Sequence, residues 1–558
     1  MKKFKEYEVE EFRSLGQAVK RNVDRQGDKA AFVYREKKEI KTVTYREFYN
    51  HALYLGNSLL KRGFVDKHVA CIGENCYRWL VVHSTMMNSN GVFVPLDRQL
   101  PKQDIVTVLN HSDSEVLFFT KKYIKILGEI KDELPNIKMF VCLDSDAVEG
   151  EYLSLDDLLA EGKSLLESGF NEYEKIEGDT DALRLLVYTS GTTGMAKGVM
   201  LSERNVMTCI NTGLRLTRLY DRAISLLPYH HTYEGIGLVA ELACGVTVFI
   251  NDSIKNILKN FEEFKPQTAF LVPAHLEAFY KKIQKALGKK KPLIDAMIAV
   301  SNGLRKCGID LRRKMFGMIL KPFGGELIKV ISGGAPIRPE IADFFESIGI
   351  TVVNGYGITE CSPLVSITRE GYDDCYTAGM PIGSVNVKIK DPDENGIGEV
   401  CVKGTSVMLG YYKNQEATDR VMEDGWFNTE DLGMFDEVGR LKITGRSKNL
   451  IVLRNGKNIF PEEIENYILS IPYVAEAAVT AWNDENGEET GLCAHVYIDP
   501  QSEMSEDPER GAKVRDDITK VCKVLPVYKQ VSRINIRKEE FVKTTTNKIK
   551  RNAIESVG

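Results

Sequence analysis

Hydrophobic positions recur with two different periods in the first 180 residues, and each period predicts a different element. Residues 44–64 place apolar side chains at a helical spacing, with a threonine at the N-terminal cap and Gly63 as a stop signal. Residues 68–73 and 91–97 are short apolar runs of the kind that form buried strands, and the second contains a proline. This alternation of helices and strands predicts layered α/β structure.

The pattern changes further along the chain. Residues 254–330 have a mostly helical period, with basic residues on the outer faces. Residues 327–337 and 350–360 are predicted strands that end in glycine-bearing loops, and ligands gather at such strand ends in open α/β sheets. After about residue 381, short strands and turns favour antiparallel β structure such as a small barrel. Helices and strands then return, which predicts a domain boundary near residues 445–448.

These patterns predict an α/β protein with two domains. The larger N-terminal domain covers residues 1–447, including a β-rich subdomain at about 382–447, and a smaller α+β domain covers residues 448–558. A chain of 558 residues is too long for a single core, which favours the division. A hydrophobic content of 43% with 27% charged residues is typical of globular proteins, so disorder is not expected.

Charge and cysteine content exclude several classes of function. The formal charge of −5 gives no overall attraction to nucleic acid. The charged N-terminus lacks the apolar core of a signal peptide, and no run approaches the about 18 apolar residues of a membrane span. Eleven scattered cysteines without a C-x-x-C pair favour reduced thiols, and the eight histidines show no metal-ligand spacing. We therefore expect a cytoplasmic protein; no segment is a clear basic amphipathic helix, and a peripheral membrane contact stays open.

The string YTSGTTGMAKGVM, at residues 188–200, has the composition of a phosphate-binding loop. A mostly apolar run at residues 183–188 leads into it and predicts a buried strand. The glycines allow close approach to an anion, the hydroxyls can donate to phosphate oxygens, and the lysine can neutralise charge. The common nucleotide loop G-x-x-x-x-G-K-[ST] does not fit, because Gly191 and Gly194 are three apart and Lys197 precedes a glycine. A surface loop rich in glycine and threonine is the alternative.

This string resembles the phosphate-binding signature of the adenylate-forming enzymes, which are the acyl-CoA synthetases, beetle luciferases and nonribosomal-peptide adenylation domains. Further segments match that family in the family's own order, and the match extends from about Thr44 to Arg551. The matching segments are LPYHHTYEG (227–235), SGGAPI (332–337), NGYGITE (354–360), the stretches 426–446 and 445–465, and FVKTTTNKIKR (541–551).

The resemblance implies a reaction in two steps. ATP with Mg²⁺ activates a carboxylic acid to an acyl-adenylate with loss of pyrophosphate, and the thiol of CoA then displaces AMP. Residues 301–337 and the glutamate of LPYHHTYE resemble the long-chain fatty acyl-CoA synthetase branch, so we expect a medium- or long-chain fatty acid. Gly235, Gly237, Ala240 and Gly245 can leave room for an acyl tunnel or can allow close helix packing.

The resemblance also implies roles for individual residues. Thr189 belongs to the loop that holds the β- and γ-phosphates, His231 lies beside the substrate carboxylate, and Glu360 ligates Mg²⁺. Lys548 bridges the carboxylate and the α-phosphate, and Asp431 accepts the ribose hydroxyls. The nucleotide-binding positions implied are Thr189, Ser190, Gly191, Thr192, Thr193, Gly194, Lys197, Gly333, Gly334, Ala335, Asn354, Gly355, Tyr356, Gly357, Thr359, Asp431 and Arg446.

The C-terminal domain carries the remaining family positions. Lys448 matches the hinge about which this domain rotates between the half-reactions, and Gly456 matches a glycine that lines the thiol tunnel. The chain departs from the family at three places. Ala196 replaces a proline, Glu430 replaces the glycine before the ribose-binding aspartate, and Asn547 replaces the glycine before the catalytic lysine. Glu430 adds a negative charge near the nucleotide. Asn547 can keep the turn, because asparagine tolerates a left-handed backbone better than other residues except glycine.

Simpler interpretations stay open for several of these residues. His231 can satisfy a buried backbone group, Tyr356 can be a core aromatic, and Arg446 can be a surface residue beside an acidic turn. The basic run at residues 520–551 can be a solvated face or can hold phosphates of ATP or CoA. At the level of function, one alternative is an acyl-AMP ligase that loads a free acyl carrier protein. Another is a non-catalytic regulator that binds an acyl group or a nucleotide.

Overall fold

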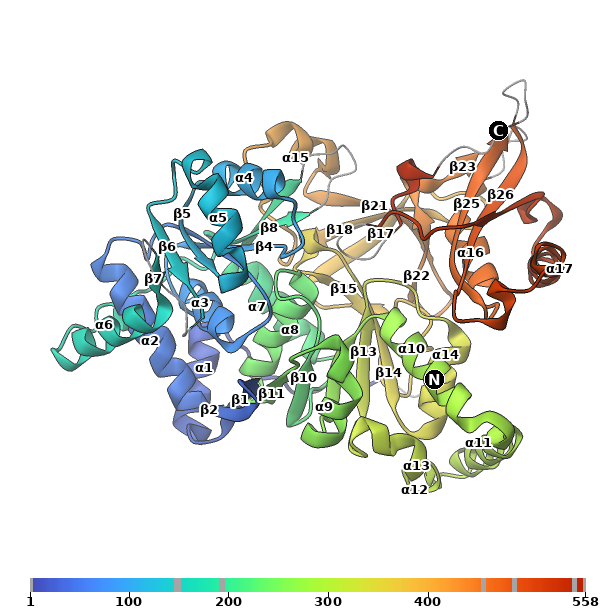
Figure 1. Cartoon of the computed structure of the whole chain (residues 1–558), viewed down its shortest axis with the longest axis horizontal. Helices are drawn as coiled ribbons and strands as arrows, with labels where there is room; N and C mark the ends of the chain where they lie inside the picture. Colours follow the sequence, from blue (N-terminus) through green and yellow to red (C-terminus); the bar gives the residue numbers. More distant parts are fainter. Residues whose placement is uncertain are drawn as a thin grey trace. The chain divides into compact units, whose positions relative to one another are not determined.

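The computed structural model describes residues 4–144, 152–189, 196–452, 458–483, 489–543 and 549–554. Contacts divide the chain into two compact units (Figure 1). The first unit comprises Met1–Asn386 and Val402–Phe427, and the second comprises Val387–Cys401 and Asn428–Gly558. A large first unit and a small second unit agree with the predicted α/β fold class. The predicted boundary between residues 447 and 448 stays a prediction.

An eight-stranded mixed sheet forms one half of the first unit, in the order β19-β9-β8-β4-β3-β5-β6-β7. The buried strands predicted at residues 68–73, 91–97 and 183–188 are confirmed as β3, β4 and β8. Strand β8 runs parallel to β4 and antiparallel to β9, so it lies inside the sheet. The bounds are β3 His68–Ile72, β4 Val92–Leu96, β5 Ser114–Phe119, β6 Met139–Cys142, β7 Leu153–Ser154, β8 Leu183–Thr189, β9 Lys197–Ser202 and β19 Gly410–Tyr411.

A nine-stranded sheet forms the other half, in the order β16-β15-β14-β13-β12-β10-β11-β1-β2. Strands β10 to β14 are mutually parallel, so their carboxyl ends meet at one edge, where open α/β sheets bind ligands. Strand β12 lies in a stretch that we expected to be mostly helical, because four residues are too few to show a period. The bounds are β1 Ala30–Glu36, β2 Glu39–Thr44, β10 Arg222–Ser225, β11 Thr247–Ile250, β12 Thr268–Leu271, β13 Lys329–Gly333, β14 Thr351–Gly357, β15 Leu364–Ile367 and β16 Met380–Pro381.

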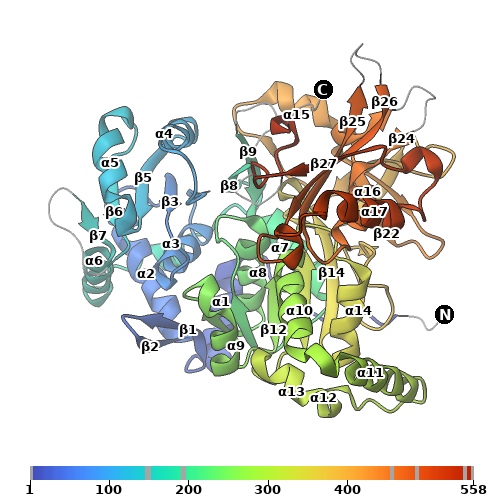
Figure 2. The same cartoon turned by 45° about the vertical axis from the view of Figure 1, so that its right-hand side comes forward.

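Helices fill the space between the two sheets and cover their outer faces (Figures 1 and 2). Helix α7 contacts β8 and β9 of one sheet and β15 of the other, and α8 contacts β10 and β11. In the outer layers, apolar side chains of α4 and α5 join the core of the first sheet, and those of α9, α10 and α14 join the core of the second. None of the helices in the described ranges is both long and apolar enough to cross a bilayer. The bounds are α1 Leu15–Gln26, α2 Tyr45–Lys61, α3 Tyr77–Met87, α4 Lys102–His111, α5 Ile124–Ile130, α6 Leu155–Glu167, α7 Glu203–Leu214, α8 Thr232–Ala243, α9 Ile257–Phe264, α10 Pro273–Leu287, α11 Lys291–Lys306, α12 Arg312–Met315, α13 Gly317–Leu320, α14 Pro339–Ile348 and α15 Gln415–Val421.

The helix predicted at residues 44–64 is confirmed as α2, together with both of its end signals. The Thr44 side chain accepts a hydrogen bond from the backbone N–H of Glu47, whose carboxylate accepts one from the N–H of Thr44 at 2.8 Å. This reciprocal capping box satisfies two donors that a helix start leaves unpaired. Gly63 has a φ of +78°, a left-handed conformation that glycine adopts without strain.

The β-rich segment after residue 382 forms a five-stranded sheet. Its order is β17-β18-β21-β20, and β22 pairs with β21. The small barrel that we expected is therefore an open sheet among the described strands. The bounds are β17 Val385–Lys390, β18 Gly398–Gly404, β20 Met422–Glu423, β21 Trp426–Phe435 and β22 Leu441–Arg446.

The rest of the second unit has its own hydrophobic core. A three-stranded sheet in the order β25-β26-β27 packs against α16 and α17 through residues such as Ile464, Val496 and Ile518. A separate pair, β23 and β24, is antiparallel. The bounds are β23 Ile451–Val452, β24 Asn458–Ile459, α16 Pro461–Leu469, β25 Val474–Asn483, β26 Glu489–Ile498, α17 Arg510–Cys522 and β27 Arg533–Arg537.

Candidate active site

The β8–β9 pair carries the two ends of the predicted phosphate-binding loop. Thr189 ends β8, Lys197 begins β9, and the two residues are paired across the strands. Side chains alternate between the faces of a strand, so Thr189 continues the row of Leu185 and Val187. The predicted loop positions Ser190, Gly191, Thr192, Thr193 and Gly194 lie outside the described residues.

Tyr411 connects Lys197 with the predicted metal ligand Glu360. The Lys197 ammonium lies 4.9 Å from the centre of the Tyr411 ring, within the range of a cation–π contact. The Tyr411 hydroxyl donates a hydrogen bond of 2.9 Å to Oε1 of Glu360. Tyr411 reaches this place because β19 pairs with β9, opposite Val199. The phosphate-loop lysine and the carboxylate therefore share one aromatic partner, which the sequence did not single out.

His231 occupies the N-cap of α8, at the end of a tight turn. Its backbone N–H donates to the Pro228 carbonyl at 3.1 Å, and its carbonyl accepts from the N–H of Gly235 at 2.8 Å. The neighbouring His230 places Nε2 3.5 Å from Oδ1 of Asp97. Burial lowers the pKa of His230 to about 4, although Asp97 acts in the opposite direction. His230 is therefore neutral at physiological pH, and the sequence reasoning missed its pairing with Asp97.

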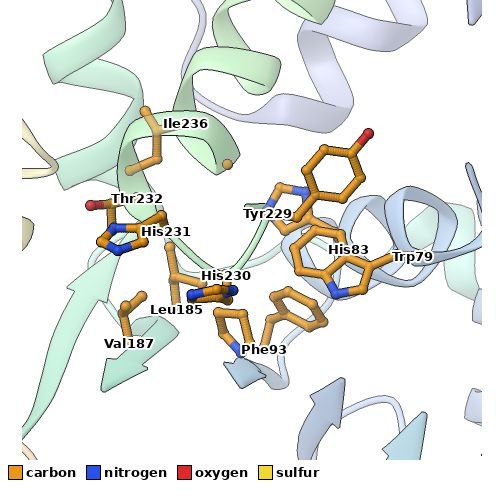
Figure 3. Close-up of a pocket in the computed structure, with 12 residues that line it drawn as sticks. Trp79, His83, Phe93, Leu185, Val187, Tyr229, His230, His231, Thr232 and Ile236 are labelled. Atoms are coloured by element: carbon orange, nitrogen blue, oxygen red, sulfur yellow. The ribbon is translucent and has the colours of Figure 1, made fainter. Parts of the chain in front are cut away.

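A small, narrow pocket lies beside this turn (Figure 3). Its walls are mostly apolar and come from α3, β4, β8 and the start of α8. The imidazole of His231 lies near Val187 and Thr232, and that of His230 points toward Leu185 and Phe93. The lining residues are Trp79, His83, Phe93, Pro95, Leu185, Val187, Tyr229, His230, His231, Thr232, Gly235 and Ile236. The free space in the pocket is about that of one water molecule, so these residues form an apolar wall with hydrogen-bonding groups at one end.

The small residues of α8 do not act as one set. Gly235 lines the pocket. A Cβ atom at Gly237 would lie 3.5 Å from the Phe270 ring, which is ordinary packing distance. Gly245 has a φ of +71°, and a Cβ there would lie 2.1 Å from the side chain of Gln26. Close packing and a left-handed turn therefore explain Gly237 and Gly245. A Cβ at Gly235 would lie 3.0 Å from the Tyr229 carbonyl oxygen, so close approach of the backbone explains this glycine as well.

A threonine pair joins this region to the loop after β14. Oγ1 of Thr232 lies 3.4 Å from Oγ1 of Thr359, which begins a single 3₁₀ turn, Thr359–Cys361. Glu360 follows at once, and its carbonyl accepts a hydrogen bond from the N–H of Met408 at 2.8 Å. The first unit thus brings Thr189, Lys197, His231, Thr359 and Glu360 into one continuous series of contacts.

Glycines shape the ends of β13 and β14. Gly333 and Gly355 are paired across these strands, and a Cβ at Gly333 would lie 3.1 Å from the Tyr233 ring. The Tyr233 hydroxyl donates to the carbonyls of Leu271 and Ile331, at 3.1 and 2.8 Å, which fixes the first turn of α8 against the sheet. The absence of a side chain at Gly333 therefore serves the fold.

The neighbouring loop positions are more open. Gly334 has a φ of +82°, and both Gly334 and Ala335 are exposed just beyond the end of β13. Gly357 is different, because a Cβ there would lie 2.2 Å from the Pro363 carbonyl oxygen. Glycine is thus required at Gly357 by the close approach of two backbones.

Asn354 and Tyr356 differ in what their side chains do. Asn354 is buried, and its side-chain amide donates to the Thr377 carbonyl at 2.7 Å. That bond holds the 377 loop, so a structural role accounts for the residue. Tyr356 is only partly buried and lies opposite Ser366 on β15. It is therefore not the fully buried core aromatic that the simpler interpretation requires.

Glu234 holds the other end of the His230–His231 turn. Its Oε1 accepts hydrogen bonds from the Ser225 hydroxyl and, at 3.1 Å, from the N–H of Leu226. Burial raises the pKa of Glu234 to about 8, so the side chain is a neutral acid at pH 7. The end of β10 is thereby tied to the first turn of α8, across the turn that carries both histidines. The sequence marked this glutamate only as a family feature.

In the second unit, Asp431 and Arg446 form an ion pair. They are paired on β21 and β22, and Arg446 Nε lies 2.9 Å from Oδ1 of Asp431, which is only 4% exposed. Glu430 has a φ of +58°, a left-handed conformation that explains why relatives carry glycine there. Its carboxylate lies 3.8 Å from the Lys448 ammonium, in the 3₁₀ turn Ser447–Asn449. The predicted positions Gly456 and Lys548 lie outside the described residues.

The donor set around Glu360 fits magnesium better than a transition metal. No group of three or more histidine, cysteine or acidic side chains able to hold a metal occurs in the described part of the chain. Magnesium sites often use only one or two carboxylates, with phosphate oxygens and water as the other ligands. The Glu360 carboxylate and the nearby Thr359 hydroxyl are hard oxygen donors of that kind.

Comparison with known proteins identifies the family to which the chain belongs. The model for AMP-binding enzymes matches residues 19–412. The chain belongs to the AMP-binding enzyme family. Among relatives, fatty acyl-CoA synthetase B of Dictyostelium discoideum is 25% identical over 92% of this chain and 81% of its own. Long-chain-fatty-acid–CoA ligase 5 of Rattus norvegicus is 31% identical over 76% of this chain and 67% of its own.

The fold of this AMP-binding enzyme is shared by solved structures. The anthranilate CoA ligase AuaEII, in complex with anthranoyl-AMP, superposes with a TM-score of 0.78 at 20% identity, over 98% of this chain and 97% of that one. The predicted resemblance to long-chain fatty acyl-CoA synthetases is confirmed. So is the expectation of an AMP-forming acid–CoA ligase that uses ATP, Mg²⁺ and CoA, at the level of the family.

Proposed function

We propose that this AMP-binding enzyme activates a medium- or long-chain fatty acid with ATP and transfers the acyl group to CoA. The names of its relatives support this assignment, since both are described as fatty acyl-CoA ligases or synthetases. The observation that carries it is the apolar pocket that ends at His231 and Thr232, beside the contacts that lead to Glu360. The chemistry of this lining, apolar walls with polar groups at one end, suits a carboxylic acid with an apolar chain, and the narrow pocket would have to open to admit that chain.

The residues of the first unit would act mainly by positioning and by neutralising charge. Thr189, Lys197 and the loop between them hold the β- and γ-phosphates, and His231 orients the carboxylate. Glu360 holds Mg²⁺, which offsets phosphate charge when bound. A carboxylate oxygen attacks the α-phosphorus, and the bond to the bridging oxygen breaks, so pyrophosphate leaves.

The remaining roles belong to the second unit and the loops at its start. Asp431 and Arg446 hold the ribose, Lys448 is the hinge, and Lys548 stabilises charge at the α-phosphate. Gly456 lines the path of the thiol. The thiolate of CoA attacks the acyl carbon, the bond to the adenylate oxygen breaks, and AMP leaves. We further propose a mobile catalytic domain at residues 448–558. We also propose a cytoplasmic location, which the scattered cysteines without a C-x-x-C pair support.

A panel of saturated acids of increasing length, assayed for pyrophosphate release with and without CoA, tests the function. We expect the highest rates with medium or long chains, and acyl-CoA formation only when CoA is present. Best activity on acetate or on an aryl acid would contradict the fatty-acid assignment. Turnover with a free acyl carrier protein in place of CoA would establish the acyl-AMP ligase alternative. Undetectable ATP–pyrophosphate exchange across the panel would favour a non-catalytic regulator.

A further inference from the structure

Exposed apolar side chains gather on α11, on α13 and in the segment between α11 and α12. Leu293 and Val300, on α11, are 62% and 59% exposed, and Met318, on α13, is 80% exposed. Ile309 and Leu311 lie between them and are also exposed. Helices α11 and α12 both contact α14, and α12 contacts α13, so these side chains belong to one region of the first unit. Figures 1 and 2 show these helices together at one edge of that unit.

Helix α11 carries apolar residues on two faces. Ile294, Met297 and Ile298 pack against the core beneath the nine-stranded sheet. Leu293 and Val300 are exposed and lie about two helical turns apart, on the same face of the helix. A helix that is apolar on both faces is normally covered on both. Because apolar residues occur on both faces, the sequence of α11 lacks the single apolar face that identifies a basic amphipathic helix, and the sequence analysis predicted none.

Positive charge surrounds these apolar side chains. Residues 281–321 contain twelve lysines and arginines and only two acidic residues, a net charge of +10 in a chain whose total is −5. Lys291 and Arg312 pair with the two acidic residues, Asp295 and Asp310. The exposed lysines of this stretch that form no ion pair with the described residues are Lys281, Lys282, Lys285, Lys289, Lys290, Lys306, Lys314 and Lys321.

We propose that this surface, formed by residues 281–321 and called here the basic–apolar surface, binds a lipid bilayer that contains anionic headgroups. The apolar side chains would enter the interface, and the lysines would meet lipid phosphates. The charge favours a bilayer over a protein partner, because interface cores are depleted of lysine. The proposal rests on the proposed function, because an enzyme that takes fatty acids finds its substrate in bilayers.

Binding of the whole chain to vesicles tests the proposal. The probes are vesicles of phosphatidylcholine alone and vesicles of phosphatidylcholine and phosphatidylglycerol in equal parts. We expect binding to the anionic vesicles that weakens as salt rises. Lys289→Glu with Lys290→Glu should raise the half-saturating lipid concentration at least about tenfold. A similar rise in the half-saturating lipid concentration is expected for the triple variant Leu293→Ser, Val300→Ser and Met318→Ser. The salt dependence of its binding should stay unchanged.

Matched variants elsewhere control for charge and for exposed apolar area. Lys5→Glu with Lys125→Glu makes the same charge change, and Ile40→Ser with Val438→Ser and Val524→Ser removes exposed side chains outside the basic–apolar surface. Both should bind vesicles like the parent, and thermal unfolding would show that every variant is folded. Equal losses in test and control variants would overturn the proposal. So would a change of oligomeric state with unaltered vesicle binding, which would indicate that a second copy covers the surface.

The two proposals can fail separately. ATP–pyrophosphate exchange with a soluble acid, measured without vesicles, reports on the proposed function alone. A protein that binds vesicles but shows no exchange would contradict the function only. A protein that shows exchange but ignores anionic vesicles would contradict the lipid surface only.

Discussion

Tyr411 makes two different interactions in the candidate site, and substitutions can separate them. Tyr411→Phe removes the hydroxyl that holds Glu360 but keeps the ring beneath Lys197. A hydrogen bond to a charged group contributes about 1.5–3 kcal/mol, so we expect roughly tenfold weaker binding of Mg²⁺–ATP, measured by calorimetry. The binding of ATP without Mg²⁺ should change little. Tyr411→Leu removes both interactions and should weaken both.

The adjacent tyrosine supplies the control. Tyr412 donates its hydroxyl to Asp113 at 2.7 Å, away from Glu360. Tyr412→Phe should therefore leave the affinity for Mg²⁺–ATP unaltered. If Tyr411→Phe binds Mg²⁺–ATP as tightly as the parent, the hydrogen bond from Tyr411 to the Glu360 carboxylate does not contribute to Mg²⁺ binding.

The left-handed backbone at Glu430 leads to a second residue-scale prediction. Only glycine adopts this conformation without steric conflict, and other residues lose about 1–2 kcal/mol there. Glu430→Gly should stabilise the second unit by about 1 kcal/mol, even though it removes the 3.8 Å pair with Lys448. Denaturant unfolding measures the change. Glu430→Ala, which keeps the strain and loses the same pair, should not stabilise; equal gains in both variants would point to the carboxylate instead.

Residue types and their order predicted the candidate site only in part. Lys197 and Glu360 stand out because a lysine after glycines and an acidic residue after a strand suit phosphate and metal. Tyr411 does not stand out, since its role depends on β19 pairing with β9 across a long stretch of chain. The Asp97–His230 pair was missed for the same reason. Local sequence does not specify which distant side chains meet.

At the scale of elements, α8 is held to the end of β10 by a buried acid. The pKa of Glu234 is about 8 in the folded protein and about 4.3 in an unfolded chain, so the folded state binds the proton more tightly. Its contribution to stability is therefore complete below about pH 4 and is lost as the pH rises toward 8. Glu234→Gln mimics the neutral acid. We expect the parent to lose stability relative to Glu234→Gln between pH 5.5 and 7.5, by up to about 1.4 kcal/mol per pH unit.

Denaturant unfolding of both proteins across that pH range measures this difference. Burial also raises the pKa of Glu241, on the same helix, so Glu241→Gln tests whether the effect belongs to the joint with β10 or to any buried acid. A pH dependence identical in the parent and in Glu234→Gln would mean that Glu234 is ionised in the folded state.

Elements with a clear period were predictable, and short ones were not. The threonine N-cap and Gly63 identified the limits of α2, and apolar runs identified β3, β4 and β8. Strand β12 was absorbed into a helical stretch, because its four residues are bounded by helices on both sides. The pattern within a strand does not specify which strands pair, so the sequence could not show whether the sheet around β21 is a closed barrel or an open sheet.

At the scale of the whole molecule, the proposed division of labour between the two half-reactions can be tested with Lys548. Lys548→Ala should abolish formation of the acyl-adenylate, because the ammonium would stabilise charge only at the α-phosphate. Transfer to CoA from supplied acyl-adenylate should be spared. Pyrophosphate release and thioester formation, measured separately, report the two steps.

Lys550→Ala is the matched control, since it removes an exposed lysine two positions away and should leave both steps unaltered. Loss of both half-reactions to the same degree in Lys548→Ala would contradict a role restricted to the first. The order of the motifs along the chain predicted the family, and the alternation of helical and strand patterns predicted the α/β class, because both are present in the sequence itself. The domain boundary near residue 447 stays a prediction, because a division into domains depends on contacts between segments that lie far apart in the sequence.

The shared phenol of Tyr411 has a thermodynamic consequence for the enzyme as a whole. Lys197 and Glu360 both contact it, so a ligand that fixes one of them restricts the other. Mg²⁺ and the nucleotide should then bind cooperatively, and by linkage each must raise the affinity of the other by the same factor. Loss of the Tyr411 side chain would uncouple the two equilibria even where each ligand can still bind.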